Sequence, residues 1–176
     1  MENYSISETT LYQHEIDTPI GTMIILADDL YIYLLDFIQR KSLQQNIIKV
    51  KNQMSARIVK KKKLIHQQIE NELVDYFTQK ITNFKTPIKL IGTKFQVRVW
   101  QALQEIPLGT TWSYGDLATY INQDKAYRAV AMANSMNRIA LIIPCHRVIN
   151  SNGSLGGYAG GVERKQWLLD HEHIAK

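Results

Sequence analysis

The residues best suited to chemistry lie in the run PCHRV, which begins at Pro144 and contains the single cysteine of the chain, Cys145. A free thiol has a pKa of about 8.5, so nucleophilic attack near neutral pH requires a neighbouring base or a positive field. His146 is the adjacent base, but its ring reaches the sulfur only through a turn or a bridging water. A carboxylate must then orient the imidazole, and Asp170 and Glu172 are the candidates near the C-terminus.

A lone cysteine also has a plainer interpretation, as a small buried side chain beside a histidine that is hydrogen-bonded in a turn. The surrounding sequence favours chemistry. The apolar run IALII (139–143) predicts a short buried strand, and Pro144 directs the chain as it leaves that strand. The run SNGSLGGYAGG (151–161) predicts a glycine-rich loop, and VERKQWLLDHE (162–172) predicts a final helix. We therefore expect a thiol at the end of a strand, facing a loop.

The segment upstream of the cysteine predicts helices. Thr93 followed three residues later by Gln96 is a capping-box pattern, which predicts that a helix begins there. Ser113 is the predicted N-cap of a second helix, and a polar turn (122–125) separates it from an alanine-rich third helix (126–136). Two short helices joined in this way are typical of a helix-turn-helix, although many helical hairpins share the spacing.

The first half of the chain has the pattern of an α/β structure. Strands are predicted at residues 11–17, 22–27 and 31–37, with a tight turn between the last two. From Leu64 the apolar spacing becomes helical, to about Lys80, and Pro87 interrupts the pattern. We therefore expect an α/β N-terminal domain (1–89) and a mainly helical C-terminal domain (90–176) that contains the helix-turn-helix.

Composition limits the classes of protein to which the chain could belong. The 176 residues are 45% apolar, which is enough for a packed core. No apolar run is long enough to span a bilayer, and the polar N-terminus, with Glu2 and Glu8, lacks the features of a signal peptide. One cysteine cannot form an internal disulfide and argues against a thiolate-rich zinc site. We expect a cytoplasmic protein without a bound metal or cofactor and without a membrane partner.

The charge balance permits a nucleic-acid partner without demonstrating one. The net charge is +5, from 21 basic and 16 acidic residues. The densest basic cluster is KKKK, from Lys60 to Lys63, which is interpreted either as a solvated surface or as a phosphate contact.

Taken together, the motifs resemble the O6-alkylguanine-DNA alkyltransferases, also called methylated-DNA–protein-cysteine methyltransferases. PCHRV resembles the active-site signature of that family. The segments GTKFQVRVWQALQEIPLGTTWSYGDLA, RAVAMANSMN, GSLGGYAGG and WLLDHE resemble it in order and spacing, across residues 92–172. TPIGTMIILADD and LLDF resemble its N-terminal region less closely.

The resemblance implies that one protein molecule removes one alkyl group from O6 of a damaged guanine and retains it irreversibly on Cys145. O4-methylthymine is a second candidate substrate. His146 would act on the thiol through a water, and Glu172 would orient the imidazole. Tyr114 would donate a hydrogen bond toward a ring nitrogen of the extruded base, with a core tyrosine at a helix start as the alternative. Arg147 is interpreted as structural.

The resemblance also implies a partner, alkylated double-stranded DNA, bound through the minor groove with the damaged base swung out of the stack. Arg128 would insert into the stack, with a phosphate contact as the alternative. Asn137 would tie the recognition helix to the active-site turn. The other candidate contacts are Ala126, Tyr127 and Ala129 for DNA, and Val148, Gly157, Tyr158 and Ala159 for the base pocket.

For the fold, the resemblance implies a ribonuclease-H-like N-terminal domain, a winged-helix-like C-terminal domain and a monomer with no obligate protein partner. The chain departs from the family pattern at two positions. Ala131 replaces a glycine, and Arg138 replaces a proline. We expect the loss of the proline to loosen the turn and the arginine to add a charge near the DNA side.

Three other classes of protein compete with this assignment. A cysteine hydrolase would use Cys145 and His146 with turnover, but it gives no reason for a helix-turn-helix. A non-catalytic lesion-binding relative would lack the cysteine, which is present. A methylation-sensing regulator would need a separate metal-binding cysteine domain, and one cysteine cannot supply it.

Overall fold

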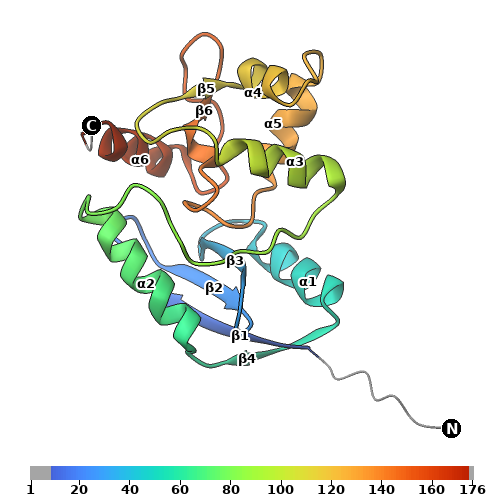
Figure 1. Cartoon of the computed structure of the whole chain (residues 1–176), viewed down its shortest axis with the longest axis vertical. Coiled ribbons are helices and arrows are strands. Elements are labelled where there is room, and N and C mark those ends of the chain that lie inside the picture. The colour runs from blue at the N-terminus through green and yellow to red at the C-terminus, as the bar shows by residue number, and fades with distance from the viewer. Residues whose placement is uncertain (1–8, 175–176) are drawn as a thin grey trace, which may run out of the picture.

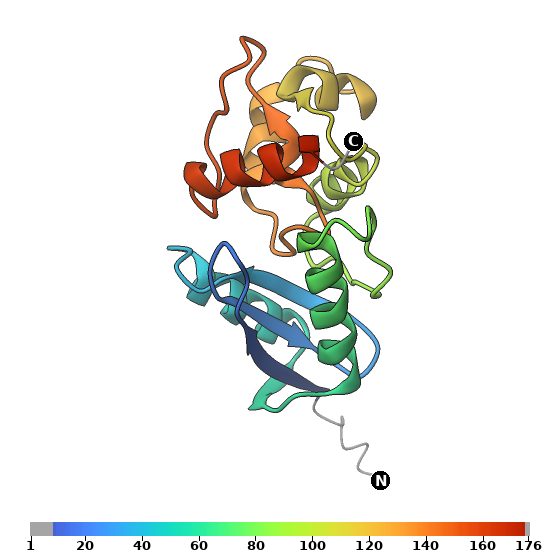
Figure 2. The ribbon, with the colours of Figure 1, turned by 90° about the vertical axis from the view of Figure 1, so that its left-hand side faces the viewer.

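The computed structural model describes residues 9–174, so that Glu2 and Glu8 lie outside the described residues. Its N-terminal part contains one mixed sheet in the order β3-β2-β1-β4 (Figures 1 and 2). The strands are β1 (Thr9–Ile16), β2 (Met23–Ala27), β3 (Ile32–Phe37) and β4 (Ala56–Lys60). Strand β4 runs parallel to β1, whereas the other neighbours are antiparallel.

Two helices bury the two faces of this sheet. Helix α1 (Leu43–Gln53) packs on one face and α2 (Leu64–Phe77) on the other. Strand β2 shows why both faces are apolar, because Ile25 contributes to the cluster that contains α2 and Leu26 to the cluster that contains α1. The predicted strands β1 to β3 and the helix α2 are confirmed, whereas α1 and β4 were not predicted.

The C-terminal part is mainly helical (Figure 1). Its elements are α3 (Lys94–Leu103), β5 (Trp112–Ser113), α4 (Tyr114–Tyr120), α5 (Tyr127–Ser135), the 3₁₀ helix η1 (Cys145–Arg147), β6 (Val148–Ile149) and α6 (Val162–Ile174). Both predicted caps are confirmed: Thr93 Oγ1 accepts from the Gln96 N–H, and Ser113 Oγ accepts from the Asp116 N–H. The predicted helical pair corresponds to α4 and α5, which pack together.

The strand predicted at residues 139–143 is wrong. Only Ile139 forms a β-bridge, to Leu35 of β3, and the chain then turns, with Leu141 at a φ of 69°. The physical reason is that the Asn137 side chain bonds across the turn, accepting from the Ile139 N–H and donating to the Ile143 carbonyl. Four of the five residues of the apolar run are buried, as predicted, and Ile142 is half-buried, but the run forms a turn beside the edge of β3.

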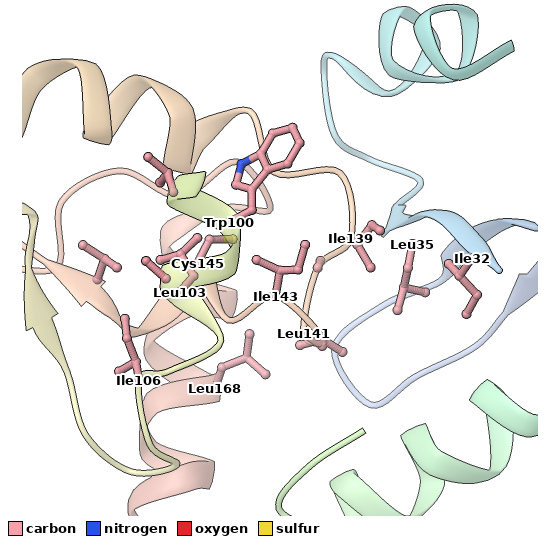
Figure 3. Close-up of a cluster of buried hydrophobic side chains, with 14 of the residues drawn as sticks. Ile32, Leu35, Trp100, Leu103, Ile106, Ile139, Leu141, Ile143, Cys145 and Leu168 are labelled. Atoms are coloured by element: carbon pink, nitrogen blue, oxygen red, sulfur yellow. The ribbon is translucent and has the colours of Figure 1, made fainter. Parts of the chain in front are cut away.

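One apolar core joins the two parts of the chain. Its members come from the α2 face of the sheet and from the C-terminal helices, and Figure 3 shows Leu35 of β3 opposite Ile139 of the turn. Cys145 belongs to the same cluster, near Leu103 and Ile143 (Figure 3). The Cys145 thiol is therefore positioned by packing that extends from the sheet to the final helix.

Candidate active site

Cys145 is the first residue of η1 and is 6% exposed. Its Sγ lies 3.1 Å from Asn137 Nδ2, which donates to it. Asn134 Nδ2, from the last turn of α5, lies 3.4 Å from the Cys145 carbonyl. The helix that the sequence predicts as the DNA-recognition helix thus contacts the backbone of the candidate nucleophile.

A hydrogen-bonded carboxylate orients the neighbouring histidine. His146 Nε2 lies 2.7 Å from Glu172 Oε1 on α6. The same carboxylate accepts from the Tyr76 hydroxyl at 2.7 Å and from Arg147 Nε at 2.8 Å. Asp170, the other candidate, is exposed and accepts from Gln166 instead. The structure therefore brings Glu172, and not Asp170, to His146.

The second ring nitrogen of His146 is left free to accept a proton. Because Nε2 donates to Glu172, Nδ1 carries the lone pair. Within residues 9–174, Nδ1 is buried and has no hydrogen-bond partner, and no hydrogen bond joins it directly to Cys145 Sγ. The arrangement brings together a thiol, an imidazole and a buried carboxylate, the three kinds of group that thiol activation requires.

Burial is the largest single influence on the pKa of each of these groups, although for Glu172 the other influences together outweigh it. Burial raises the pKa of the Cys145 thiol, while the Asn137 hydrogen bond and the Arg40 charge oppose the rise. Burial lowers the pKa of His146, against the opposing effect of Glu172. For Glu172 burial acts upward, but the bonds from His146 and Arg147 hold its pKa well below the usual range. In the resting site, Glu172 is ionised and His146 is neutral.

A cavity of about 360 Å³ opens at the thiol, a volume typical of sites for small ligands. Predicted residues that line it are Cys145, Tyr114, Gly157, Tyr158 and Ala159. Ala131, Asn134 and Ser135 of α5 complete the lining. Val148 lies outside this lining; it is fully buried, and its carbonyl accepts from Lys165 Nζ at 2.6 Å.

Two tyrosines, Tyr114 and Tyr158, line this mainly apolar cavity. Burial and the nearby Cys145 raise the pKa of Tyr114, so that its hydroxyl remains protonated. The Tyr158 hydroxyl is buried and lacks a hydrogen-bond partner among the described residues. Burial also raises the pKa of Tyr158 well above its usual value. Both side chains are therefore neutral groups with a hydrogen to donate.

The predicted DNA-contacting residues lie together at the start of α5. Tyr127, Arg128 and Ala129 are exposed, and Ala126 is half-buried. The Arg128 guanidinium lies 5.6 Å from the centre of the Tyr127 ring. This end of α5 is opposite to the end that contacts the Cys145 backbone.

The expectation that Arg138 adds a charge near the DNA side is wrong. The arginine is 7% exposed and does not add a surface charge. It donates to the Ile91 carbonyl, lies 3.4 Å from Asn46 Oδ1 on α1, and is positioned over the Trp100 ring. Its own carbonyl accepts from the Leu35 N–H at 2.9 Å. The segment that lacks the family's proline is therefore held by buried hydrogen bonds.

Sequence reasoning missed several residues that contact the site. Asn134 is a polar residue on the otherwise apolar buried face of α5, and that position could have identified it. Tyr76 and Lys165 lie on predicted helices, but the spacing of residues within each helix does not predict which other segment those side chains contact. Lys165 Nζ donates to the carbonyls of Val148 and Leu155, and burial lowers its pKa to about 8.

The basic run from Lys60 to Lys63 lies at the end of β4, with ion-pair partners for two of its members. Lys62 pairs with Glu70, and Lys63 pairs with Asp29 at 2.8 Å. These contacts favour the interpretation of the run as a solvated surface over its interpretation as a phosphate-binding site.

Among the described residues, no group of three or more metal-ligating side chains could hold a metal ion. None of the described helices combines the length and apolar character needed to cross a membrane.

Comparison with known proteins gives a consistent assignment. Residues 94–174 match the family model described as the DNA-binding domain of 6-O-methylguanine DNA methyltransferase. A methylated-DNA–protein-cysteine methyltransferase of Methanosarcina mazei is 39% identical over 165 residues, which is 92% of this chain and 97% of the relative. The Salmonella typhimurium protein of the same name is 36% identical over 92% of this chain and 95% of its own.

Solved structures agree with the sequence relatives. The Mycobacterium tuberculosis O6-methylguanine methyltransferase has a TM-score of 0.81 at 34% identity, covering 94% of each chain. The M. tuberculosis OGT in complex with DNA has a TM-score of 0.79 at 35% identity, covering 95% of this chain and 94% of that one. The chain belongs to the family of methylated-DNA–protein-cysteine methyltransferases.

Proposed function

We propose that this protein repairs O6-methylguanine in DNA by transferring the methyl group to Cys145, one group per protein molecule. The observation that carries the proposal is the position of the thiol at a cavity, next to an imidazole that a buried carboxylate orients. In the reaction the bond from the methyl carbon to O6 breaks and a bond from that carbon to Sγ forms. The resulting thioether is chemically inert, so the methyl group stays on the sulfur and the protein is consumed.

The proton of the thiol must leave as the bond to carbon forms. We infer that it passes through a water to His146 Nδ1, and that Glu172 stabilises the imidazolium. Tyr76 and Arg147 hold Glu172 in place, so their role is to position the carboxylate. The electron pair of the broken carbon–O6 bond passes to the guanine, which takes up a proton from water. Tyr114, which lines the cavity, would stabilise the developing negative charge by donating a hydrogen bond to the base.

The size of the cavity and its place beside α5 suggest how DNA is bound. A base inside a duplex cannot reach a buried thiol, so the damaged nucleotide must be rotated out of the stack into the cavity. We propose that α4 and α5 act as a helix-turn-helix in the minor groove and that Arg128 occupies the space left by the base. Tyr127 and Ala129 are exposed beside it, with Ala126 half-buried.

The finer assignment of the fold belongs to the same proposal. We assign residues 1–89 to a ribonuclease-H-like domain, which the order of the mixed sheet supports, and residues 90–176 to a winged-helix-like domain. We further propose that the protein acts as a monomer on alkylated duplex DNA in the cytoplasm. O4-methylthymine is a second substrate to test.

A titration tests this function. Duplex DNA containing O6-methylguanine is added in increasing amounts to a fixed amount of protein, and the guanine restored in the DNA is measured at completion. The proposal predicts a plateau at one guanine per active protein, and none with Cys145→Ser. Continued turnover beyond that ratio would support the cysteine hydrolase instead.

A further inference from the structure

Asn137 is the residue through which the thiol is held, and the rest of its environment determines where the thiol lies. Its side-chain Nδ2 donates to the Ile143 carbonyl at 2.9 Å and to Cys145 Sγ at 3.1 Å. Its Oδ1 accepts from the Ile139 N–H at 2.9 Å. The backbone carbonyl of Asn137 accepts from Arg40 Nη1 at 2.5 Å. The group that contacts the thiol is therefore anchored to the N-terminal part of the chain.

Arg40 lies between β3 and α1 and is 9% exposed. Besides Asn137, its guanidinium donates to the carbonyl of Ser135, the last residue of α5, at 2.7 Å. Asp36 Oδ2 accepts from Nη1 at 2.7 Å, and Ser42 Oγ accepts from Nε at 2.9 Å. Asp36 and Ser42 thus fix the guanidinium. The guanidinium in turn donates hydrogen bonds to the end of α5 and to Asn137, the residue that contacts the sulfur.

The edge of β3 holds the same segment by its backbone. The Leu35 N–H donates to the Arg138 carbonyl at 2.9 Å, and the Ala140 N–H donates to the Leu35 carbonyl at 2.7 Å. Figure 3 shows the side chains of Leu35 and Ile139 facing each other where these bonds form. Backbone pairing therefore fixes the position of residues 138–140, while Arg40 fixes the carbonyls that precede them.

We propose that Arg40 is a positioning residue for methyl transfer. It holds Asn137, and through Asn137 the Cys145 sulfur, at a fixed position relative to the end of the recognition helix. The inference rests on the proposed function for its effect on repair. It gives the N-terminal part of the chain a specific task, beyond completing the core. It also links α5, which we assign to DNA, to the thiol through one buried cation.

The electrostatics act in the same direction as the geometry. The charged groups that influence the thiol are Arg40 and Lys165, which lower its pKa, and Asp36, which raises it. The hydrogen bond from Asn137 lowers the pKa further. Loss of Arg40 removes one favourable charge and the hydrogen bond to the Asn137 carbonyl, so both effects leave the thiol harder to ionise.

The test compares Arg40→Gln, Arg40→Lys and the control Arg57→Gln in the full chain. Arg57 is an arginine of the same N-terminal part, and it donates to Thr10 Oγ1 on the exposed surface. Two rates are measured for each folded protein: methyl transfer from duplex DNA, and alkylation of Cys145 by iodoacetamide as a function of pH. Melting temperature reports stability separately.

The inference predicts that Arg40→Gln raises the apparent pKa of Cys145 by roughly half a unit to one unit, and slows transfer by roughly three- to tenfold or more at neutral pH. Arg40→Lys keeps the cation but replaces the planar guanidinium, whose Nη1 and Nη2 reach the two carbonyls, by a single nitrogen. It should therefore restore the pKa in part and remain slower in transfer. Arg57→Gln should match the wild type in both rates.

Unchanged rates and an unchanged pH profile in a folded Arg40→Gln protein would overturn the inference, because a merely structural arginine would lower only the melting temperature. If Arg40→Gln does not fold, Arg40→Lys provides the test. A wild-type rate of methyl transfer together with a wild-type pH profile of alkylation in Arg40→Lys would overturn the inference. The alkylation profile does not depend on repair. A wild-type protein that takes up no methyl group would therefore contradict the proposed function, while the profile would still decide the role of Arg40.

Discussion

His146 Nε2 and Glu172 Oε1 lie 2.7 Å apart, although 26 positions separate them in the chain, and both side chains are fully buried. The pair exists because η1 packs against α6, and because Tyr76 of α2 and Arg147 donate to the same carboxylate. A buried carboxylate with three donors remains ionised, and an ionised carboxylate fixes the tautomer of the imidazole.

Removing either member of this pair should slow transfer while leaving DNA binding intact. We expect His146→Ala to reduce the rate of methyl transfer by about 10²-fold, the lower range for loss of a general base. Glu172→Gln should have a smaller kinetic effect but should lower the free energy of unfolding by about 3 kcal/mol, because Arg147 loses its buried partner. Single-turnover rates, DNA titrations and chemical denaturation measure the three quantities. Weakened DNA binding in His146→Ala would contradict the assignment.

Arg128→Ala should separate base extrusion from chemistry. If the arginine holds the extruded state, its loss restores an unstacking cost of a few kcal/mol. Repair of duplex O6-methylguanine should then fall roughly tenfold or more, since about 1.4 kcal/mol is a factor of ten. Reaction with the free base O6-benzylguanine, if the cavity accepts it, should be nearly unchanged. An equal loss on both substrates would show that Arg128 shapes the cavity.

A phosphate contact by Arg128 predicts a different result. Binding to all DNA would weaken, and the dependence of affinity on salt would become shallower by about one contact. A salt titration of the wild type and Arg128→Ala distinguishes this role from insertion into the stack.

Arg138→Met should destabilise the protein without changing its affinity for DNA. The buried guanidinium donates to the Ile91 carbonyl and lies 3.4 Å from Asn46 Oδ1, so its removal leaves buried acceptors unpaired. The expected loss in free energy of unfolding is about 1–3 kcal/mol. Chemical denaturation and DNA titration of the two proteins provide the comparison. A loss of DNA affinity at unchanged stability would restore the expectation of a charge facing DNA.

Asp36 should give the stability a distinctive dependence on pH. Burial raises its pKa to about 6 from 3.8, against the opposing effect of Arg40. A raised folded-state pKa means that its contribution to stability is fully present below about pH 4 and is lost as the pH rises through about 6. Relative to Asp36→Asn, the wild type should therefore lose up to about 3 kcal/mol between these values. If the difference in free energy of unfolding between the wild type and Asp36→Asn stays constant across that pH range, Asp36 is ionised throughout it and its pKa is not raised.

The local features of the fold could be predicted from the sequence, whereas contacts between distant segments could not. The caps at Thr93 and Ser113 depend on residues three positions apart, and both are present. The run at residues 139–143 was predicted as a strand because its composition is apolar and β-branched. Its conformation is set by the Asn137 side chain and by the edge of β3, which lies about a hundred residues earlier.

The same distinction applies to the site. PCHRV and the C-terminal glutamate could be found by motif, because their types and order are unusual. Arg40 and Tyr76 could not, since each reaches the site from another part of the chain through a contact of a single side chain. Arg138 shows the converse error: a charged residue was assigned to the surface, yet the fold supplies buried carbonyl and amide acceptors for it.

The most direct test of the account is intact-protein mass spectrometry after incubation with duplex DNA containing O6-methylguanine, followed by peptide mapping. We predict that each active molecule gains the mass of one methyl group in place of one hydrogen, carried only by the peptide that contains Cys145, and that Cys145→Ser gains none. An unmodified protein alongside repaired DNA, or a methyl group on any other peptide, would contradict transfer to Cys145.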